Sequence, residues 1–173
     1  MKLIVMGYSG SGKSTLTKQL ASTYCLPALY LDQVHFESDW KERDQTAALK
    51  IVQSVMQQED WIIDGNYRQF YYEERLVQAD HIYLLLFSRF QCLLRVIKRT
   101  VKYHGNVRPD MAEGCPERFD LAFIWWILYE GRTRSRRKAF QKIATMYPNK
   151  VSVVKSQKQL DKIYQTIKKA GPN

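Results

Sequence analysis

The segment Gly7–Thr15 (GYSGSGKST) carries residue types that can hold a polyphosphate. Gly7 and the run Gly12-Lys13-Ser14 fit the spacing G-x-x-x-x-G-K-[ST], the motif of a phosphate-binding loop. Glycines let the main chain turn tightly and gather several N–H groups around an anion. Lys13 is expected to reach the outer phosphates of a nucleotide, and the Ser14 hydroxyl to hold Mg²⁺. The predicted nucleotide-binding residues are Gly7, Ser9, Gly10, Ser11, Gly12, Lys13, Ser14 and Thr15.

The context of this motif favours a bound nucleotide over the alternative, a glycine-rich turn without a ligand. Residues 3–6 form an apolar run that predicts a buried strand, and residues 15–24 place Leu16 and Leu20 on one helical face. A strand, a glycine loop and a helix N-terminus in succession form an anion site, because the first N–H groups of the helix point at the ligand. We therefore expect ATP bound together with Mg²⁺.

Polar residues follow the next two apolar runs of the chain. Asp32 and His35 come after residues 28–31, and either side chain could contact a substrate hydroxyl or a water on Mg²⁺. Asp64 ends the run 61–63 and is expected to bind waters on the metal, as an acid at this position does in many nucleotide-hydrolysing proteins. The alternatives are that Asp32 only caps a turn and that Asp64-Gly65 is an ordinary Asp-Gly turn. The predicted acceptor-binding residues are Asp32, His35, Gly65, Asn66 and Arg68, and the predicted metal-binding residues are Ser14 and Asp64.

Two pairs of arginines have the i, i+4 spacing that places side chains on one helical face. Arg95 and Arg99 form the first pair, and Arg132 and Arg136 form the second. Like charges at this spacing repel each other, so an anion between them would relieve a real cost. Arginines can also stabilise the charge that develops on a transferring phosphoryl group. Together with Lys13 and Asp64, these four arginines are the predicted catalytic residues. The alternative is that the arginines only form solvated helix faces.

Apolar runs alternate with helical patterns, which predicts βαβ units, a five-stranded parallel sheet and a three-layer, doubly wound α/β fold. The expected strands lie near residues 2–6, 28–31, 61–63, 81–87 and 150–154. The expected helices lie near residues 13–24, 43–58, 68–78, 89–103, 119–145 and 157–169. In the helix 89–103, the stripe opposite the arginines is expected to pack inward; it consists of Leu93, Ile97 and Val101.

Two segments between these elements are candidates for substrate-handling parts. Residues 104–118 contain Gly105, Pro109, Gly114 and Pro116, so they cannot form one regular element and predict a mobile flap. With the residues that follow, this flap gives an expected lid over about 104–131. Residues 32–60 are the expected acceptor-binding region.

The bulk composition bounds the class of protein. At 173 residues, with 45% hydrophobic and 25% charged residues, the chain is expected to form one globular domain. Its longest apolar run, at 121–129, is far shorter than a membrane span. Three cysteines without metal-site spacing, and no leader segment, favour a cytoplasmic protein with reduced thiols.

The net charge of +10 is unevenly distributed. Residues 1–86 carry 8 Lys and Arg against 11 Asp and Glu, whereas residues 87–173 carry 19 against 6. This asymmetry points to an anionic partner for the second half of the chain. A polyphosphate and a nucleic acid both fit that description.

The order of GYSGSGKST, LDQVH, WIIDGNY, the pair Arg95 and Arg99, and RPDMAEGCPE resembles the bacterial topology modulation proteins, a branch of the adenylate-kinase-like P-loop kinases. The resemblance implies that Asp64-Gly65 organises magnesium waters and the acceptor. It implies that Arg95 lies near the ATP base and phosphates and Arg99 at the start of the lid. It also implies that Arg132 and Arg136 clamp the transferring phosphate. Nucleoside-monophosphate kinases usually continue Asp-Gly with Phe-Pro-Arg, whereas this chain continues with Asn66-Tyr67-Arg68 and has a short acceptor-binding insertion.

The sequence thus predicts a Mg²⁺-ATP-dependent kinase that transfers the γ-phosphate to a small acceptor bearing a hydroxyl or phosphate group, with a nucleotide or nucleoside-like acceptor favoured. The alternative is an ATP-binding regulatory protein that binds nucleic acid and affects DNA topology. No membrane partner is expected, and the chain is expected to be a monomer or a homodimer.

Overall fold

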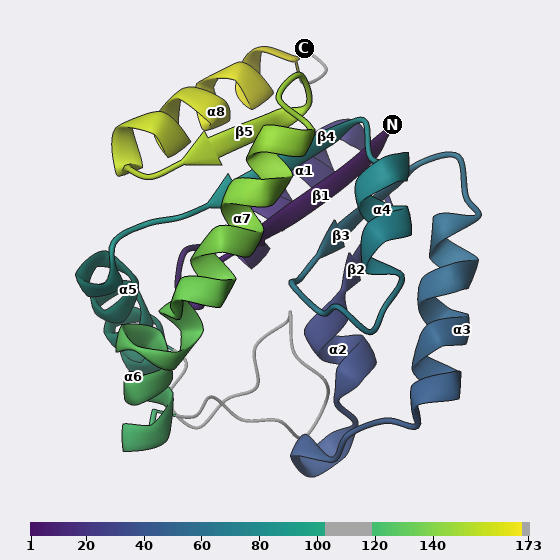
Figure 1. Cartoon of the computed structure of the whole chain (residues 1–173). Helices are drawn as coiled ribbons and strands as arrows, with labels where there is room; N and C mark the ends of the chain where they lie inside the picture. The colour runs from purple at the N-terminus through teal and green to yellow at the C-terminus, as the bar shows by residue number, and fades with distance from the viewer. Residues whose placement is uncertain (103–118, 171–173) are drawn as a thin grey trace.

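The computed structural model describes residues 1–102 and 119–170. Its centre is a sheet of five parallel strands in the order β2-β3-β1-β4-β5 (Figure 1). The strands are β1 (Lys2–Gly7), β2 (Ala28–Tyr30), β3 (Trp61–Asp64), β4 (His81–Leu85) and β5 (Val151–Val154). The predicted α/β class with a five-stranded parallel sheet is confirmed.

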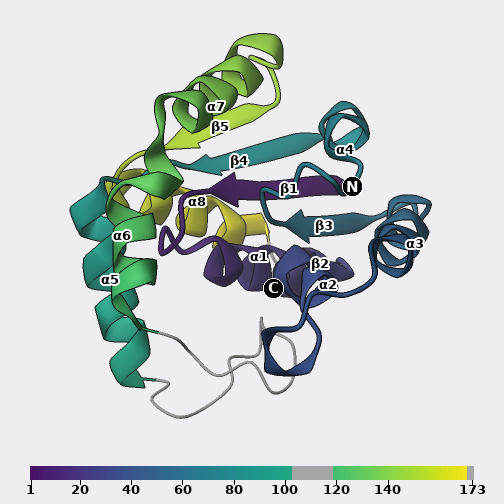
Figure 2. The same cartoon turned by 60° about the horizontal axis from the view of Figure 1, so that its bottom comes forward.

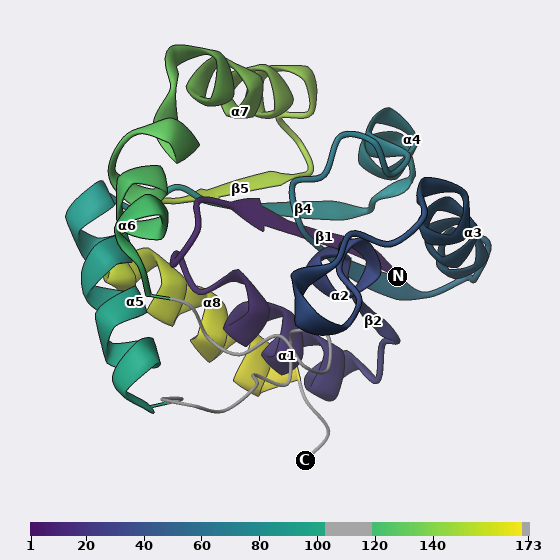
Figure 3. The same cartoon turned by 90° about the horizontal axis from the view of Figure 1, so that it is seen from below.

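Helices cover both faces of the sheet, so the central strands are apolar on both sides. Figure 3 shows α1 and α8 on one side, and α3, α4 and α7 on the other. These helices are α1 (Lys13–Tyr24), α8 (Gln157–Ala170), α3 (Gln45–Met56), α4 (Tyr72–Gln78) and α7 (Arg134–Met146). All four residues of β3 are buried between these layers, the first three of them completely. The core therefore runs through the sheet and continues to the point where β3 reaches Asp64.

The remaining helices lie at the end of the sheet to which the strands point. Figure 2 shows α5 and α6 side by side near the carboxyl ends of β1 and β4. They are α5 (Arg89–Lys102) and α6 (Leu121–Leu128), and the short α2 (Leu31–His35) follows β2 directly. Two 3₁₀ turns, η1 (Ser38–Trp40) and η2 (Glu130–Arg132), complete the described elements. In parallel α/β sheets ligands bind at this edge.

Three expectations about the elements were wrong. The helix expected near 68–78 begins only at Tyr72, and the strand expected over 81–87 ends at Leu85. The single helix expected over 119–145 is divided into α6, η2 and α7. Here the main chain turns at Gly131, where an added Cβ would lie 2.9 Å from the carbonyl oxygen of Trp126. Asp120 and Thr133 accept hydrogen bonds from N–H groups in the first turns of α6 and α7, so each helix has its own start.

The expected inward packing of the apolar stripe on α5 is confirmed for Leu93, which packs against the core, and was wrong for the other two residues. Ile97 is 39% and Val101 75% exposed, whereas Cys92 and Val96 are buried. Residues 104–118 of the expected lid lie outside the described residues, and its last part forms α6 and the start of η2. Among the helices of residues 1–102 and 119–170, none has the length and apolar content that crossing a bilayer requires.

Candidate nucleotide and acceptor site

The loop between β1 and α1 has the conformation of an anion cradle. Gly12 is the N-cap of α1, has a φ of 93° and supplies no side chain to the first N–H groups of the helix. These groups have no carbonyl partner within the helix, so they face the loop. Gly10 has a φ of 73°, and a Cβ there would lie 2.6 Å from Val96 Cγ2. The positive φ angle favours glycine at both positions, and at Gly10 the close approach of α5 also leaves no room for a Cβ.

Lys13 and Ser11 lie inside this loop. The Lys13 Nζ donates a hydrogen bond to the carbonyl oxygen of Tyr8 at 3.2 Å, so the ammonium group folds back across the loop. The Ser11 side chain is fully buried, and its Oγ has no hydrogen-bond partner among the described residues. A buried hydroxyl without a partner is uncommon in folded proteins. The loop therefore offers a cation, unpaired helix N–H groups and an unpaired hydroxyl, a donor set that fits the phosphates of a nucleotide.

The end of β3 is joined to this loop by main-chain and side-chain hydrogen bonds. Asp64 is 5% exposed and pairs in register with Val5 of β1. Asn66 accepts from the N–H of Gly7 at 3.0 Å and donates to its carbonyl at 2.7 Å. This pair of bonds fixes the residues after β3 against the first glycine of the loop. Asn66, predicted to bind the acceptor, therefore holds the two loops together.

Arg75, which the sequence did not single out, supports the same segment from behind. Arg75 is 1% exposed, and its guanidinium donates to the carbonyl oxygens of Phe70 at 2.7 Å and Tyr67 at 2.6 Å. A third nitrogen lies 3.5 Å from the carbonyl oxygen of Gly65. Burial lowers the pKa of Arg75 to about 10. The sequence did not predict this role, because Arg75 follows two glutamates and resembles an exposed residue of a charged helix.

Asp32 and His35 lie on α2, beside the segment after β3. Asp32 accepts a 2.7 Å hydrogen bond from the Tyr67 hydroxyl. Burial, together with the nearby Asp32 carboxylate, raises the pKa of Tyr67, so Tyr67 stays a donor and keeps Asp32 oriented. The His35 ring packs against Phe36, Tyr67 and Phe70, with its Nε2 3.5 Å from Glu42. His35 is thus part of an aromatic cluster, and this environment gives no support to a contact with the acceptor.

Arg95 extends from α5 to the phosphate-binding loop. It donates one hydrogen bond to the carbonyl oxygen of Ser11 and a second, at 2.6 Å, to Gln157 of α8. Its guanidinium also lies 3.8 Å from the centre of the Phe87 ring. Arg95 is therefore anchored beside the loop, close to Gly12. Arg99 lies one turn further along α5.

Arg132 is engaged by the protein itself. Its nitrogens donate to the carbonyl oxygens of Ile127 and Phe87, at 3.0 and 2.9 Å, and to the Cys92 sulfur at 3.1 Å. Its guanidinium also lies over the Tyr8 ring at 3.9 Å. These contacts join η2 to α6, the segment after β4, α5 and the phosphate-binding loop. In this conformation Arg132 acts as a positioning group and has few donors left for a ligand.

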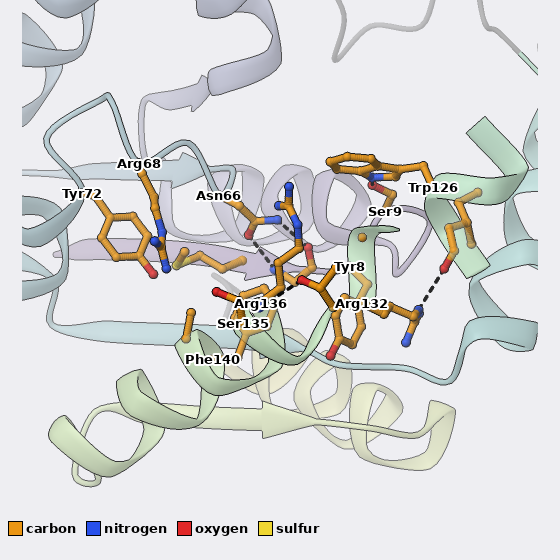
Figure 4. A pocket seen from close by; sticks show the side chains of 16 residues that line it. Tyr8, Ser9, Asn66, Arg68, Tyr72, Trp126, Arg132, Ser135, Arg136 and Phe140 are labelled. Carbon is orange, nitrogen blue, oxygen red and sulfur yellow. Dashed lines mark hydrogen bonds between the residues drawn. The ribbon is translucent and has the colours of Figure 1, made fainter. Parts of the chain in front are cut away.

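The Arg136 side chain, by contrast, makes no hydrogen bond to another described residue, and it packs on an aromatic ring. Its guanidinium lies 4.6 Å from the centre of the Trp126 ring. The Trp126 indole N–H in turn donates to the Ser9 hydroxyl at 3.2 Å. Figure 4 shows Ser9, Trp126 and Arg136 around the same cavity. Trp126 lies within the apolar run 121–129, and the sequence predicted no part for it in a site.

A cavity of about 300 Å³ lies between the phosphate-binding loop, the segment after β3 and α7. Cationic side chains enter it from two sides, since Arg68 comes from the segment after β3, and Arg132 and Arg136 come from η2 and α7 (Figure 4). Lys13 and Asp64 are not among the residues that line it. The cavity is lined by Met6, Gly7, Tyr8, Ser9, Asn66, Arg68, Tyr72, Trp126, Ile127, Gly131, Arg132, Thr133, Ser135, Arg136, Ala139 and Phe140. Its size lies at the lower end of the range for small-molecule sites.

The described residues contain no group of three or more His, Cys, Asp or Glu side chains arranged to hold a metal ion. Mg²⁺ in nucleotide sites commonly takes only one or two protein oxygens, with phosphates and waters completing its shell. The Ser14 hydroxyl, in the first turn of α1, and the Asp64 carboxylate, at the end of β3, are oxygen donors of this kind. The donor set therefore fits a magnesium ion that arrives with a nucleotide.

Comparison with known proteins supports the fold only. No known family profile matches the chain, and no functionally curated protein matches its sequence. The crystal structure of a "putative kinase" from Chloroflexus aurantiacus J-10-fl matches with a TM-score of 0.52 and 14% identity, covering 99% of each chain. An uncharacterized protein from Eubacterium ventriosum ATCC 27560 matches with a TM-score of 0.47 and 16% identity, covering 97% of this chain and 99% of that one. At 14% identity the likeness to the structure from Chloroflexus aurantiacus concerns the fold, and the resemblance to topology modulation proteins stays a prediction from sequence.

Proposed function

We propose that the chain is a Mg²⁺-ATP-dependent phosphotransferase whose acceptor is a small molecule bearing a hydroxyl or phosphate group. The observation that carries this proposal is the joining of two sites. An anion cradle with Lys13 inside it adjoins a cavity that Arg68 and Arg136 enter, and Ser9 belongs to both. A nucleotide-binding protein without an acceptor has no need of a second cationic cavity beside the loop.

The nucleotide half of the proposed site consists of the β1–α1 loop and the residues around it. The N–H groups of the loop and of the first turn of α1 would bind the phosphates, with Lys13 reaching the outer ones. Ser14, with Asp64 acting through waters, would hold the magnesium ion. Arg95, already bonded to the carbonyl oxygen of Ser11, would keep positive charge beside the phosphates.

The acceptor half consists of the cavity and the side chains that hold its shape. Arg68 and Arg136 give the cavity two cations that could attract a phosphate or carboxylate group of the acceptor. Trp126 holds the Ser9 hydroxyl at the border between the two halves. Asn66 fixes the distance between the halves, because it bonds both main-chain groups of Gly7.

Phosphoryl transfer requires little covalent chemistry from a protein. Bound ATP with magnesium supplies the phosphoryl group, and the protein supplies positioning and positive charge. Arg136 would stabilise the negative charge that develops during transfer. Its guanidinium packs on the Trp126 ring, and the indole N–H of Trp126 donates to the Ser9 hydroxyl, so the positive charge lies close to the phosphate-binding loop. The side chains of Trp126, Ile127 and Phe140 would exclude bulk water from the cavity.

The proposal is tested by ADP release from Mg²⁺-ATP in the presence of nucleoside monophosphates, nucleosides, sugar acids and DNA ends. We expect Lys13→Ala to lower turnover with the best acceptor by at least about 100-fold, because the outer phosphates lose their cation. Lys18→Ala is the matched control, since Lys18 is an exposed lysine on the same helix. Equal turnover by Lys13→Ala and the unaltered chain, both folded by circular dichroism, would contradict the proposal.

A further inference from the structure

Helix α5 turns its apolar side outward. Phe90, Leu94, Ile97 and Val101 are 69, 59, 39 and 75% exposed, and together they form a row that we call the α5 seam. The opposite side of the helix faces the protein, where Cys92 and Val96 are buried and Arg95 reaches the phosphate-binding loop. A surface helix normally buries its apolar stripe and exposes its charges. The reversed orientation of α5 indicates that the seam is covered by something else.

The spacing of the α5 seam is that of a coiled coil. Its residues are separated by four, three and four positions, which is the alternation of a and d positions in a heptad. Such a seam is narrower than the apolar face of an ordinary surface helix. Helices that lie on a bilayer have a wide apolar face opposite a charged one. The narrow seam therefore fits another helix better than a lipid surface.

Helix α6 adds a second exposed stripe next to the seam. Leu121, Trp125 and Tyr129 lie four residues apart and are 83, 54 and 49% exposed; we call them the α6 stripe. The two helices run side by side in Figures 2 and 3. The guanidinium of Arg89, at the start of α5, lies 5.5 Å from the ring of Tyr129, just after the end of α6. The helices are therefore antiparallel, and each carries an exposed apolar row.

We infer that the α5 seam and the α6 stripe bind the same surface of a second copy of this chain, related by a two-fold axis. Two antiparallel helices from each copy would then form a four-helix bundle, the common way to close such a surface. In an antiparallel pairing of the seams, Leu94 packs against Ile97 of the other copy. Lys98, the charged residue of α5 that lies nearest the seam on the helical face, would then face Gln91 of the other copy, so like charges would not oppose each other.

The exposed area is sufficient for a stable dimer. The seven side chains of the α5 seam and the α6 stripe expose on the order of 800 Å² per copy, taking about 200 Å² for a large side chain. A standard protein interface buries about 800 Å² per partner. Apolar patches of this size are rare on monomers. Since the inner side of α5 carries Arg95, dimerisation would also fix the helix that contacts the phosphate-binding loop.

Sedimentation velocity of the full chain, without nucleotide, tests the inference. We expect the unaltered protein to sediment with twice the mass of the 20.4 kDa chain at concentrations from about 1 to about 100 µM. The variant Leu94→Glu/Val101→Glu is expected to weaken the dimer by at least about 30-fold, because both seams acquire a charge. Val77→Glu is the matched control, since Val77 is an exposed valine on α4, and this variant should stay dimeric.

Charge pairing tests the antiparallel register. Leu94→Glu and Ile97→Lys should each be monomeric alone, and an equal mixture of the two should form a mixed dimer. A monomeric unaltered chain at the highest concentration would overturn the inference, and so would a dimer that survives Leu94→Glu/Val101→Glu. Flotation of the monomeric unaltered chain with vesicles of phosphatidylcholine and phosphatidylglycerol would assign the surface to a bilayer instead. Normal circular dichroism of each variant, together with its binding of Mg²⁺-ATP, would separate a failed dimer from a failed fold or nucleotide site.

Discussion

Arg75 shows how one buried side chain can shape the candidate acceptor site without contacting a ligand. Its guanidinium lies beneath the segment after β3 and donates to the carbonyl oxygens of Tyr67 and Phe70. Although burial lowers its pKa to about 10, Arg75 is still protonated at neutral pH. A buried cation bonded to main-chain carbonyl groups holds the path of the chain in a way that an apolar side chain cannot.

We expect Arg75→Met to lower the free energy of unfolding by about 2–4 kcal/mol, because the carbonyl groups beneath the segment lose a charged donor. Arg68→Met should change it by less than about 0.5 kcal/mol, since Arg68 is exposed. Urea unfolding followed by circular dichroism measures both values. Equal stability of the two variants would mean that the buried hydrogen bonds of Arg75 contribute little to folding.

Arg132 and Arg136 have different roles in the structure, although the sequence predicted the same role for both. Their i, i+4 spacing predicted that both act on one anion. In the structure Arg132 donates to main-chain carbonyls and the Cys92 sulfur, whereas Arg136 lies over Trp126 beside the cavity. Spacing predicts a shared face only where one helix is continuous, and here Arg132 lies in η2 whereas Arg136 lies in α7. Spacing also does not reveal which carbonyl groups from distant segments meet each side chain.

At the scale of elements, the strands were easier to predict than the helix boundaries. The central strands β1 and β3 are short apolar runs that end at Gly7 and Asp64, and burial on both faces requires that pattern. The end of β4 was placed too late because the apolar run continues past Leu85 to Phe87. Helix α2 was missed because Leu31–His35 is too short to show a helical period. The break between α6 and α7 was missed because apolar and basic residues continue across Gly131 with a helical rhythm.

The break at Gly131 gives a prediction for the element that carries the aromatic wall of the cavity. An added Cβ at this position would lie 2.9 Å from the carbonyl oxygen of Trp126 and 3.2 Å from its indole nitrogen. We therefore expect Gly131→Ala to displace Trp126 and to lower the free energy of unfolding by about 1–3 kcal/mol.

Thermal and urea unfolding measure this cost, and the shift of the tryptophan emission maximum reports the displaced ring. Ala122→Ser is the control. It also adds one heavy atom to α6, but Ala122 is exposed, so we expect no change in stability. An unchanged emission maximum together with unchanged stability in Gly131→Ala would show that the turn adapts to a Cβ.

At the scale of the whole molecule, the fold distributes the basic half of the sequence in several directions. Figure 3 shows α7 and α8 on opposite sides of the sheet, and each carries exposed basic residues, such as Arg137 and Lys162. Arg95 and Arg132 bond to the phosphate-binding loop and to main-chain carbonyls. Composition revealed the excess of positive charge, but only the three-dimensional arrangement separates charge around one small site from a continuous basic surface.

This arrangement leads to a prediction about the alternative function, nucleic-acid binding. A duplex can contact only one side of the molecule at a time, so few phosphates should be neutralised together. We expect the slope of log affinity for duplex DNA against log salt concentration to be no steeper than about −3, with binding lost between about 50 and about 200 mM salt. Fluorescence anisotropy of a labelled duplex measures the slope, with and without Mg²⁺-ATP. A slope near −6 or steeper would require six or more phosphate contacts, and it would favour the nucleic-acid function over a small acceptor.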